Sequence, residues 1–72
     1  MKYEVITEYG SSPQNAADRL SREIGNYLRT LHEDNKVHIS DAQIYRNPLA
    51  NPDEQEESKK LWFAYATVQV IH

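Results

Sequence analysis

Cysteine is absent from the chain, and glycine and proline are scarce, with two and three copies in 72 residues. Without cysteine the chain forms neither disulfides nor thiolate zinc sites, which are common means of stabilising so short a domain. A domain of this size buries only about 60% of the surface that its unfolded chain exposes. The sequence therefore predicts a tightly packed core or association with a second subunit, in a reducing compartment.

Excess positive charge and long apolar runs are missing too. Eight lysine and arginine residues stand against eleven acidic ones, so no basic surface is predicted that would attract the phosphates of a nucleic acid. The longest uncharged run, residues 61–72, is too short to span a bilayer. The first residues lack the apolar segment of a signal peptide. We expect a soluble, cytoplasmic protein that binds neither membranes nor nucleic acids.

Residues that carry out chemistry are few and scattered. Glycine occurs only at positions 10 and 25, so no glycine-rich loop can hold a phosphate group. The three histidines, His32, His38 and His72, lack the spacing of metal ligands on one helix. The sequence predicts no catalytic residue, no metal and no cofactor, and hence no enzyme.

Residues 2–9 alternate in character and predict a β-strand. One face of this strand carries uncharged side chains, those of Tyr3, Val5, Thr7 and Tyr9. The other face carries mainly charged ones, those of Lys2, Glu4, Ile6 and Glu8.

A helix is predicted to begin at Ser12 and Pro13, because the serine hydroxyl can cap free N–H groups and proline has no N–H to leave unpaired. Behind them, apolar side chains recur at steps of three and four and form one stripe, made of Ala17, Leu20, Ile24, Tyr27, Leu28 and Leu31. The stripe ends near Asn35, which we expect to close the helix in a left-handed conformation. Gly25 costs the helix about 1 kcal/mol relative to alanine, and we attribute it to close approach of a sheet.

The second strand, residues 37–45, contains a break in its alternation. Its apolar side chains change parity between Ile39 and Ala42. Two explanations fit this change: a β-bulge near residues 40–41, or a strand that begins only there. Residues 47–60 follow, acidic and without apolar periodicity, and predict a long, mobile hairpin loop.

Residues 61–71 form the last and most apolar strand, with aromatic and β-branched residues on both parities. At an edge this strand would invite aggregation, so we place it at the centre of the sheet. The predicted fold class is α+β, a single β-α-β-β domain over residues 1–72. Its three-stranded antiparallel sheet has the order 2-3-1, and one helix crosses over one face in a right-handed connection.

The two faces of the last strand differ in bulk. Ala64 and Ala66 allow a helix to approach closely, so the parity that begins at Trp62 is predicted to lie under the helix. The opposite parity would then form an open aromatic face, which is typical of a protein-interaction surface. We assign this surface to Phe63, Tyr65, Tyr3 and Tyr45, with Tyr9 on the same face. The function predicted is that of a small interaction or accessory protein, which forms a homodimer through its sheet or binds an unidentified protein partner.

Two short motifs resemble known families. The order of the elements, with Ile24-Gly25-Asn26-Tyr27-Leu28 in the helix and residues 62–68 in the last strand, resembles a group of small sporulation-associated proteins of endospore-forming bacteria. That resemblance implies the fold and no defined activity. The Gly10-Ser11-Ser12-Pro13 turn resembles dodecin, a flavin-storage protein that stacks flavin on a tryptophan of its second strand. The only tryptophan here is Trp62, in the third. A dodecin-like flavin-binding module is the alternative function.

Overall fold

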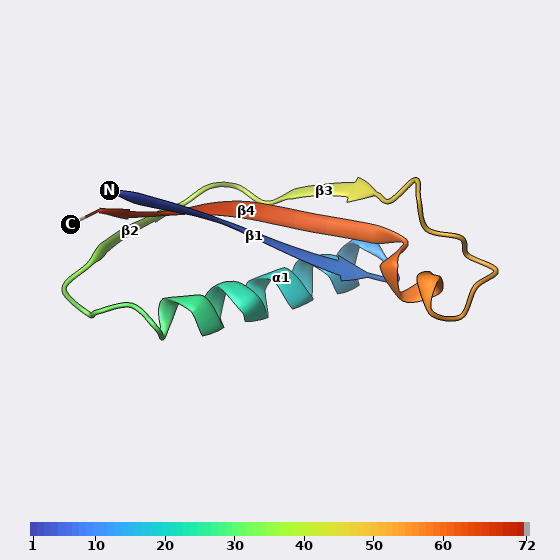
Figure 1. Cartoon of the computed structure of the whole chain (residues 1–72), viewed down its shortest axis with the longest axis horizontal. Coiled ribbons are helices and arrows are strands. Elements are labelled where there is room, and N and C mark those ends of the chain that lie inside the picture. Colours follow the sequence, from blue (N-terminus) through green and yellow to red (C-terminus); the bar gives the residue numbers. More distant parts are fainter. Residues whose placement is uncertain (72) are drawn as a thin grey trace.

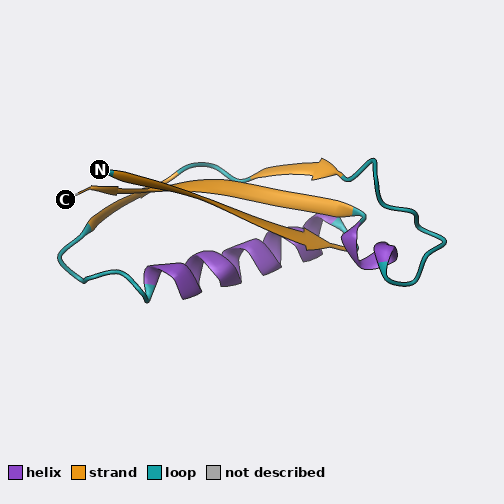
Figure 2. Cartoon of the chain, viewed as in Figure 1, coloured by secondary structure: helices purple, strands orange, loops and turns teal. Residues whose placement is uncertain are grey.

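The computed structural model describes residues 1–71, which form one sheet with one long helix along its face (Figure 1, Figure 2). The elements are β1 (Lys2–Gly10), α1 (Pro13–Leu28), β2 (Lys36–Ile39), β3 (Gln43–Arg46), the 3-10 helix η1 (Glu57–Lys60) and β4 (Trp62–Ile71). The molecule is elongated, 46 Å along its longest axis and 17 Å and 16 Å across.

β4 is the central strand of the sheet, as predicted. β1 pairs antiparallel with one side of it, while β2 and β3 pair antiparallel with the other side. This arrangement confirms the α+β class, the antiparallel pairing and the order 2-3-1. The predicted second strand is divided into β2 and β3, so the sheet has four strands rather than three.

A bulge separates β2 from β3. The pairing with β4 shifts by one residue between Ile39, which lies opposite Val68, and Gln43, which lies opposite Tyr65. One extra residue is therefore accommodated on the outer strand, and this explains the change in parity between its two halves. The first of the two explanations offered for the sequence pattern is confirmed.

The start of α1 is confirmed as well. The Ser12 hydroxyl accepts a hydrogen bond from the N–H of Asn15 at 3.1 Å, and Pro13 occupies the first helical position. Both residues therefore act as the sequence suggests, one by satisfying a free N–H group and the other by lacking one.

The predicted end of the helix is wrong. α1 ends at Leu28, and the Thr30 hydroxyl donates to the carbonyl of Tyr27 at 2.6 Å. This side-chain bond takes up a carbonyl of the last turn, and the backbone continues in tight three-residue turns. Asn35 does not adopt a left-handed conformation, because no residue among 1–71 has a positive φ.

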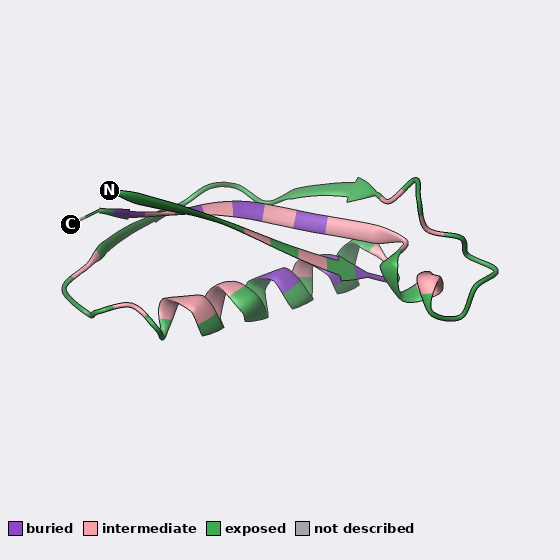
Figure 3. Cartoon of the chain, in the orientation of Figure 1, coloured by how far each residue is buried: buried purple, intermediate pink, exposed green. Residues whose placement is uncertain are grey.

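The core is small and lies between α1 and the middle of the sheet (Figure 3). Six hydrophobic side chains are buried within residues 1–71, those of Ala16, Leu20, Ala64, Ala66, Val68 and Val70. Alternate residues of β4 therefore face the helix side, which confirms the predicted orientation of this strand. Three of the six are alanines, so the core removes little apolar area from water.

The interpretation of Gly25 is wrong. A Cβ atom at this position would meet nothing within 4 Å, so no close approach of the sheet requires a glycine there. The close approach occurs at Gly10, where a Cβ atom would lie 2.4 Å from the backbone nitrogen of Ala16. Ala16 is fully buried, whereas the predicted Ala17 is only partly so. The end of β1 thus packs directly on the first turn of α1.

Residues 47–61 connect the antiparallel strands β3 and β4, as the predicted hairpin loop requires. The loop contains η1, which the sequence did not suggest because no apolar periodicity marks it. The side-chain amide of Asn47 donates to the carbonyl of Lys60 at 2.9 Å, and the N–H of Asn51 donates to the Glu57 carboxylate at 2.8 Å. The predicted mobility of this loop stays a prediction.

Candidate protein-interaction face

The face of the sheet turned away from α1 carries the aromatic residues singled out from the sequence. Residues directly opposite each other on neighbouring strands project from the same face. Phe63 lies opposite Tyr9 on β1 and opposite Tyr45 on β3, so three strands bring aromatic rings to one end of this open face. Tyr65, two residues along β4, extends the group.

These four rings form what we call the aromatic cluster: Tyr9, Tyr45, Phe63 and Tyr65. Ring centroids lie 5.7 Å apart for Tyr45 and Phe63, 6.1 Å for Tyr45 and Tyr65, and 6.4 Å for both Phe63–Tyr65 and Tyr9–Phe63. Phe63 takes part in three of these four contacts and is the centre of the cluster. Tyr9 and Tyr45 remain 42% and 48% exposed, so the cluster presents its rings to solvent.

Tyr3 lies on the open face but outside the aromatic cluster. Its partner across the ladder is Gln69, near the opposite end of β4. The Tyr3 hydroxyl and the Gln69 amide both donate to the sulfur of Met1, at 3.2 Å and 3.1 Å. The structure therefore brings together three of the four predicted surface residues, Phe63, Tyr65 and Tyr45, and places Tyr3 apart from them.

β1 shows a reversed distribution of charge between its two faces. Its helix-facing parity carries Lys2, Glu4 and Glu8, which lie opposite buried residues of β4. On that parity Ile6 is the apolar residue that packs against the core. The open parity of β1, by contrast, is uncharged. An antiparallel sheet with one face in water normally alternates in the opposite sense, apolar toward the core and polar toward solvent.

The rest of the open face is equally poor in charge. Among the paired residues that project from it, Lys36, at the end of β2, is the only one with a formal charge. At the other end of the face, the ammonium group of Lys60 lies 5.9 Å from the centre of the Tyr9 ring. A stretch without formal charge, flanked by a cation at each end, is thus left between them.

Other kinds of site find no support in the part of the chain that the structure describes. No three potential ligands there come close enough to hold a metal ion, and His72 lies outside the described residues. No helix within 1–71 is long and apolar enough to cross a membrane. Trp62 packs against the core rather than projecting from the open face, and flavin binding stays a prediction.

Comparisons with protein-family models, with curated proteins and with solved structures find no match to this chain. The resemblances to sporulation-associated proteins and to dodecin therefore stay predictions. Function has to be inferred from the surfaces of the chain itself.

Proposed function

We propose that this protein is a small interaction protein that forms a homodimer through the open face of its sheet. The observation that carries the proposal is the reversed charge distribution of β1, with charges beside the helix and uncharged side chains on the open face. Packing of the open face against a second copy removes the aromatic cluster from water and leaves the charges of β1 hydrated. This is the distribution expected of a strand that is covered on its open side.

The small core supports the same proposal. Three of the six buried hydrophobic side chains among residues 1–71 are alanines, and a chain of this length has little stability to spare. A second subunit supplies the apolar burial that the monomer lacks. Four uncharged rings within such an interface match the enrichment of tyrosine and phenylalanine in interface cores.

The area of the open face indicates how tightly two copies should associate. A central strand of ten residues and one neighbour on each side give a face about 33 Å long and about 14 Å wide. Two such faces bury on the order of 1,000 Å², the lower limit of specific interfaces. We therefore expect a dissociation constant in the micromolar range, about 1–100 μM.

Sedimentation velocity tests the proposal with the full chain. As concentration rises from about 1 μM to about 1 mM, the mass should rise from 8.4 kDa to twice that value. A chain that stays monomeric at the highest concentration contradicts the proposal.

Substitutions then locate the interface. Phe63→Ser and Tyr65→Ser should weaken association at least about tenfold while leaving the core intact, because both side chains project away from α1. Leu49→Ser is the matched control, since Leu49 is apolar and 89% exposed but lies in the loop. Equal weakening by Leu49→Ser, or unchanged association of Phe63→Ser, places the interface elsewhere. Circular dichroism confirms that each variant is folded.

A further inference from the structure

The outer edge of β1 has backbone N–H and C=O groups that no strand within residues 1–71 pairs with. Which residues supply these groups follows from the hydrogen bonds between β4 and the segment that joins β2 to β3. The N–H of Ser40 donates to the Thr67 carbonyl at 3.0 Å, and the N–H of Thr67 donates to the Ser40 hydroxyl at 2.9 Å. Both backbone groups of Thr67 thus point away from β1. Residue pairs in an antiparallel ladder alternate between bonded and non-bonded. Val5, opposite Thr67, therefore turns its N–H and C=O outward.

The same alternation gives the whole pattern along β1. Tyr3, Thr7 and Tyr9 share the parity of Val5, so four N–H groups and four carbonyls of this strand face outward along one edge. No strand among the described residues pairs with this edge. It is a template on which a further strand can form hydrogen bonds.

The two edges of the sheet differ in how well they are protected against pairing with an added strand. The β2–β3 edge consists of two strands of four residues, separated by the bulge, and such interruptions prevent an added strand from pairing along the full length. β1 is nine residues long and pairs with β4 in one unbroken register without proline. The open edge is therefore the long and regular one.

α1 lies off the centre of the sheet, on the side of this open edge. The helix packs chiefly on β1 and β4 and less on β3. On the far side, Val37 and Ile39 project from the helix-side parity of β2 yet remain 37% and 41% exposed. A strand added next to β1 would lie over the uncovered flank of the helix, and the helix would then lie beneath the middle of the sheet.

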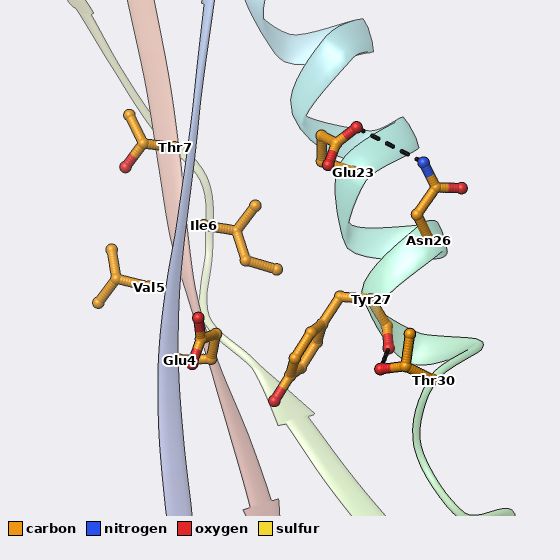
Figure 4. A pocket seen from close by; sticks show the side chains of 8 residues that line it. All are labelled: Glu4, Val5, Ile6, Thr7, Glu23, Asn26, Tyr27 and Thr30. Carbon is orange, nitrogen blue, oxygen red and sulfur yellow. Dashed lines mark hydrogen bonds between the residues drawn. The ribbon is translucent and has the colours of Figure 1, made fainter.

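An open groove of about 440 Å³ lies at this place, between residues 4–7 of β1 and the last two turns of α1 (Figure 4). Its formally charged groups are two carboxylates, those of Glu4 and Glu23. The side chain of Tyr27 extends from α1 toward the sheet within the groove (Figure 4). The Tyr27 hydroxyl is buried, and it has no hydrogen-bond partner among residues 1–71. Two anionic acceptors and one unpaired hydroxyl thus border a free strand edge.

We propose that the outer edge of β1 receives an extended segment of another protein as an additional strand, with a lysine or arginine side chain in the groove. The backbone of the added strand would pair with the outward groups of β1. Its basic side chain would point beneath the sheet toward Glu4 and Glu23, which accept hydrogen bonds but donate none when ionised. The Tyr27 hydroxyl can accept a further bond from the same cation.

Charge distinguishes this occupant from a second copy of the chain. In an antiparallel pair of two β1 strands, the helix-side residues of the incoming copy would include its own Glu4 and Glu8 and one cation, Lys2, which together carry a net negative charge. These would bring further carboxylates to a groove that already contains two, and like charges at close range oppose pairing. The proposed dimer uses the open face and leaves this edge free, so the two proposals concern different surfaces.

A displayed library of random nine-residue peptides, selected against the immobilised full chain, tests the proposal. The enriched peptides should share lysine or arginine at one position, between alternating β-forming residues. Glu4→Gln/Glu23→Gln should bind them at least about tenfold more weakly, whereas Glu33→Gln/Glu54→Gln, an equal charge change outside the groove, should bind them unchanged. Enrichment of acidic peptides, absence of any enrichment, or equal loss in both double variants overturns the proposal.

Thr7→Pro tests the edge itself. This substitution removes an outward N–H and leaves the bonds between β1 and β4 in place, so peptide binding should be lost while circular dichroism shows that the fold is kept. Undiminished peptide binding by this variant overturns the edge as the site.

Hydrogen exchange tests the proposal on the wild-type chain, so the result does not depend on whether a variant folds. A bound peptide should slow exchange at the N–H groups of Tyr3, Val5, Thr7 and Tyr9 at least about tenfold, and those of Glu4, Ile6 and Glu8 much less. Equal slowing at both sets, or slowing confined to residues of β3 and β4, contradicts strand addition. A wild-type chain that forms the dimer but binds no selected peptide would overturn this inference alone and leave the proposed function standing.

Discussion

The Thr67 amide in the middle of β4 donates its hydrogen bond to a side chain, the hydroxyl of Ser40, at 2.9 Å. In a regular ladder this acceptor is a backbone carbonyl. Here the Ser40 hydroxyl oxygen takes the place of that carbonyl. The outer strand can therefore contain an extra residue while the Thr67 N–H of the central strand keeps an acceptor. The bulge between β2 and β3 therefore depends on the chemistry of a single serine.

Replacing Ser40 by alanine should destabilise the protein by about 1 kcal/mol, because the Thr67 N–H loses its acceptor. Thermal unfolding followed by circular dichroism measures the change. Ser40→Thr keeps the hydroxyl and should recover most of the stability. Ser11→Ala is the neutral control, since the Ser11 hydroxyl makes no hydrogen bond in the structure. A Ser40→Ala variant as stable as wild type would show that the serine does not hold the bulge.

Gly25→Ala should stabilise the protein by about 1 kcal/mol. The position lies inside α1, its φ is not positive, and an added methyl group meets nothing within 4 Å. The gain comes from the higher helix propensity of alanine and the reduced freedom of the unfolded chain. Chemical denaturation gives the midpoint shift. A loss of stability would mean that the sheet approaches this position after all.

The same substitution at Gly10 should act in the opposite direction, by about 2 kcal/mol or more. Its Cβ atom would lie 2.4 Å from the Ala16 nitrogen, a backbone atom that cannot move without shifting the start of α1. The two glycine variants form a matched pair, each adding one methyl group, and the same denaturation experiment measures both. Equal effects at the two positions would contradict the packing of β1 on the first turn of α1.

Tyr27→Phe should leave the isolated protein as stable as wild type or raise its stability by about 1 kcal/mol. The hydroxyl is buried and finds no partner among residues 1–71, and an unsatisfied buried polar group costs free energy that its removal recovers. Binding of the selected basic peptides should fall several-fold in the same variant. A drop in stability without any change in peptide binding would assign the hydroxyl to the fold alone.

The melting temperature of the wild-type chain should rise with protein concentration. Dimerisation stabilises the folded state by mass action. A tenfold increase in protein concentration therefore raises the free energy of unfolding by at most about 1.4 kcal/mol per dimer. Phe63→Ser, which removes the ring common to three of the four aromatic contacts, should abolish this dependence. A melting temperature that is independent of concentration in wild type would argue for a monomer.

Periodicity in the sequence predicts one helix, three strands and the strand order 2-3-1, but neither η1 nor the fourth strand. The unbroken apolar run of β4 predicts its central place, whereas the change of parity after Ile39 fits a bulge or a later strand start, and the pairing with β4 selects the bulge. The early end of α1 could not be predicted, because Leu31 continues the apolar stripe and the bond from Thr30 to the Tyr27 carbonyl has no periodic signal.

The position of α1 across the width of the sheet could not be predicted from the sequence either. Gly10 stands in a turn and Gly25 inside the helix, and only the placement of α1 under β1 decides that Gly10 is crowded while Gly25 is not. For the same reason Tyr27 was assigned to the core stripe, although its hydroxyl ends unpaired beside Glu4. The register between strands, which separates Tyr3 from the aromatic cluster, depends likewise on long-range pairing.

The interruption between β2 and β3 limits how this protein can polymerise. Growth of a sheet from molecule to molecule needs two complementary edges on every subunit, so that each addition creates a new site for the next. Here one edge is long and regular and the other is broken by the bulge. If the outer edge of β1 accepts a strand as proposed, addition ends after one step, and we expect this exposed nine-residue strand to give complexes of fixed size rather than fibres.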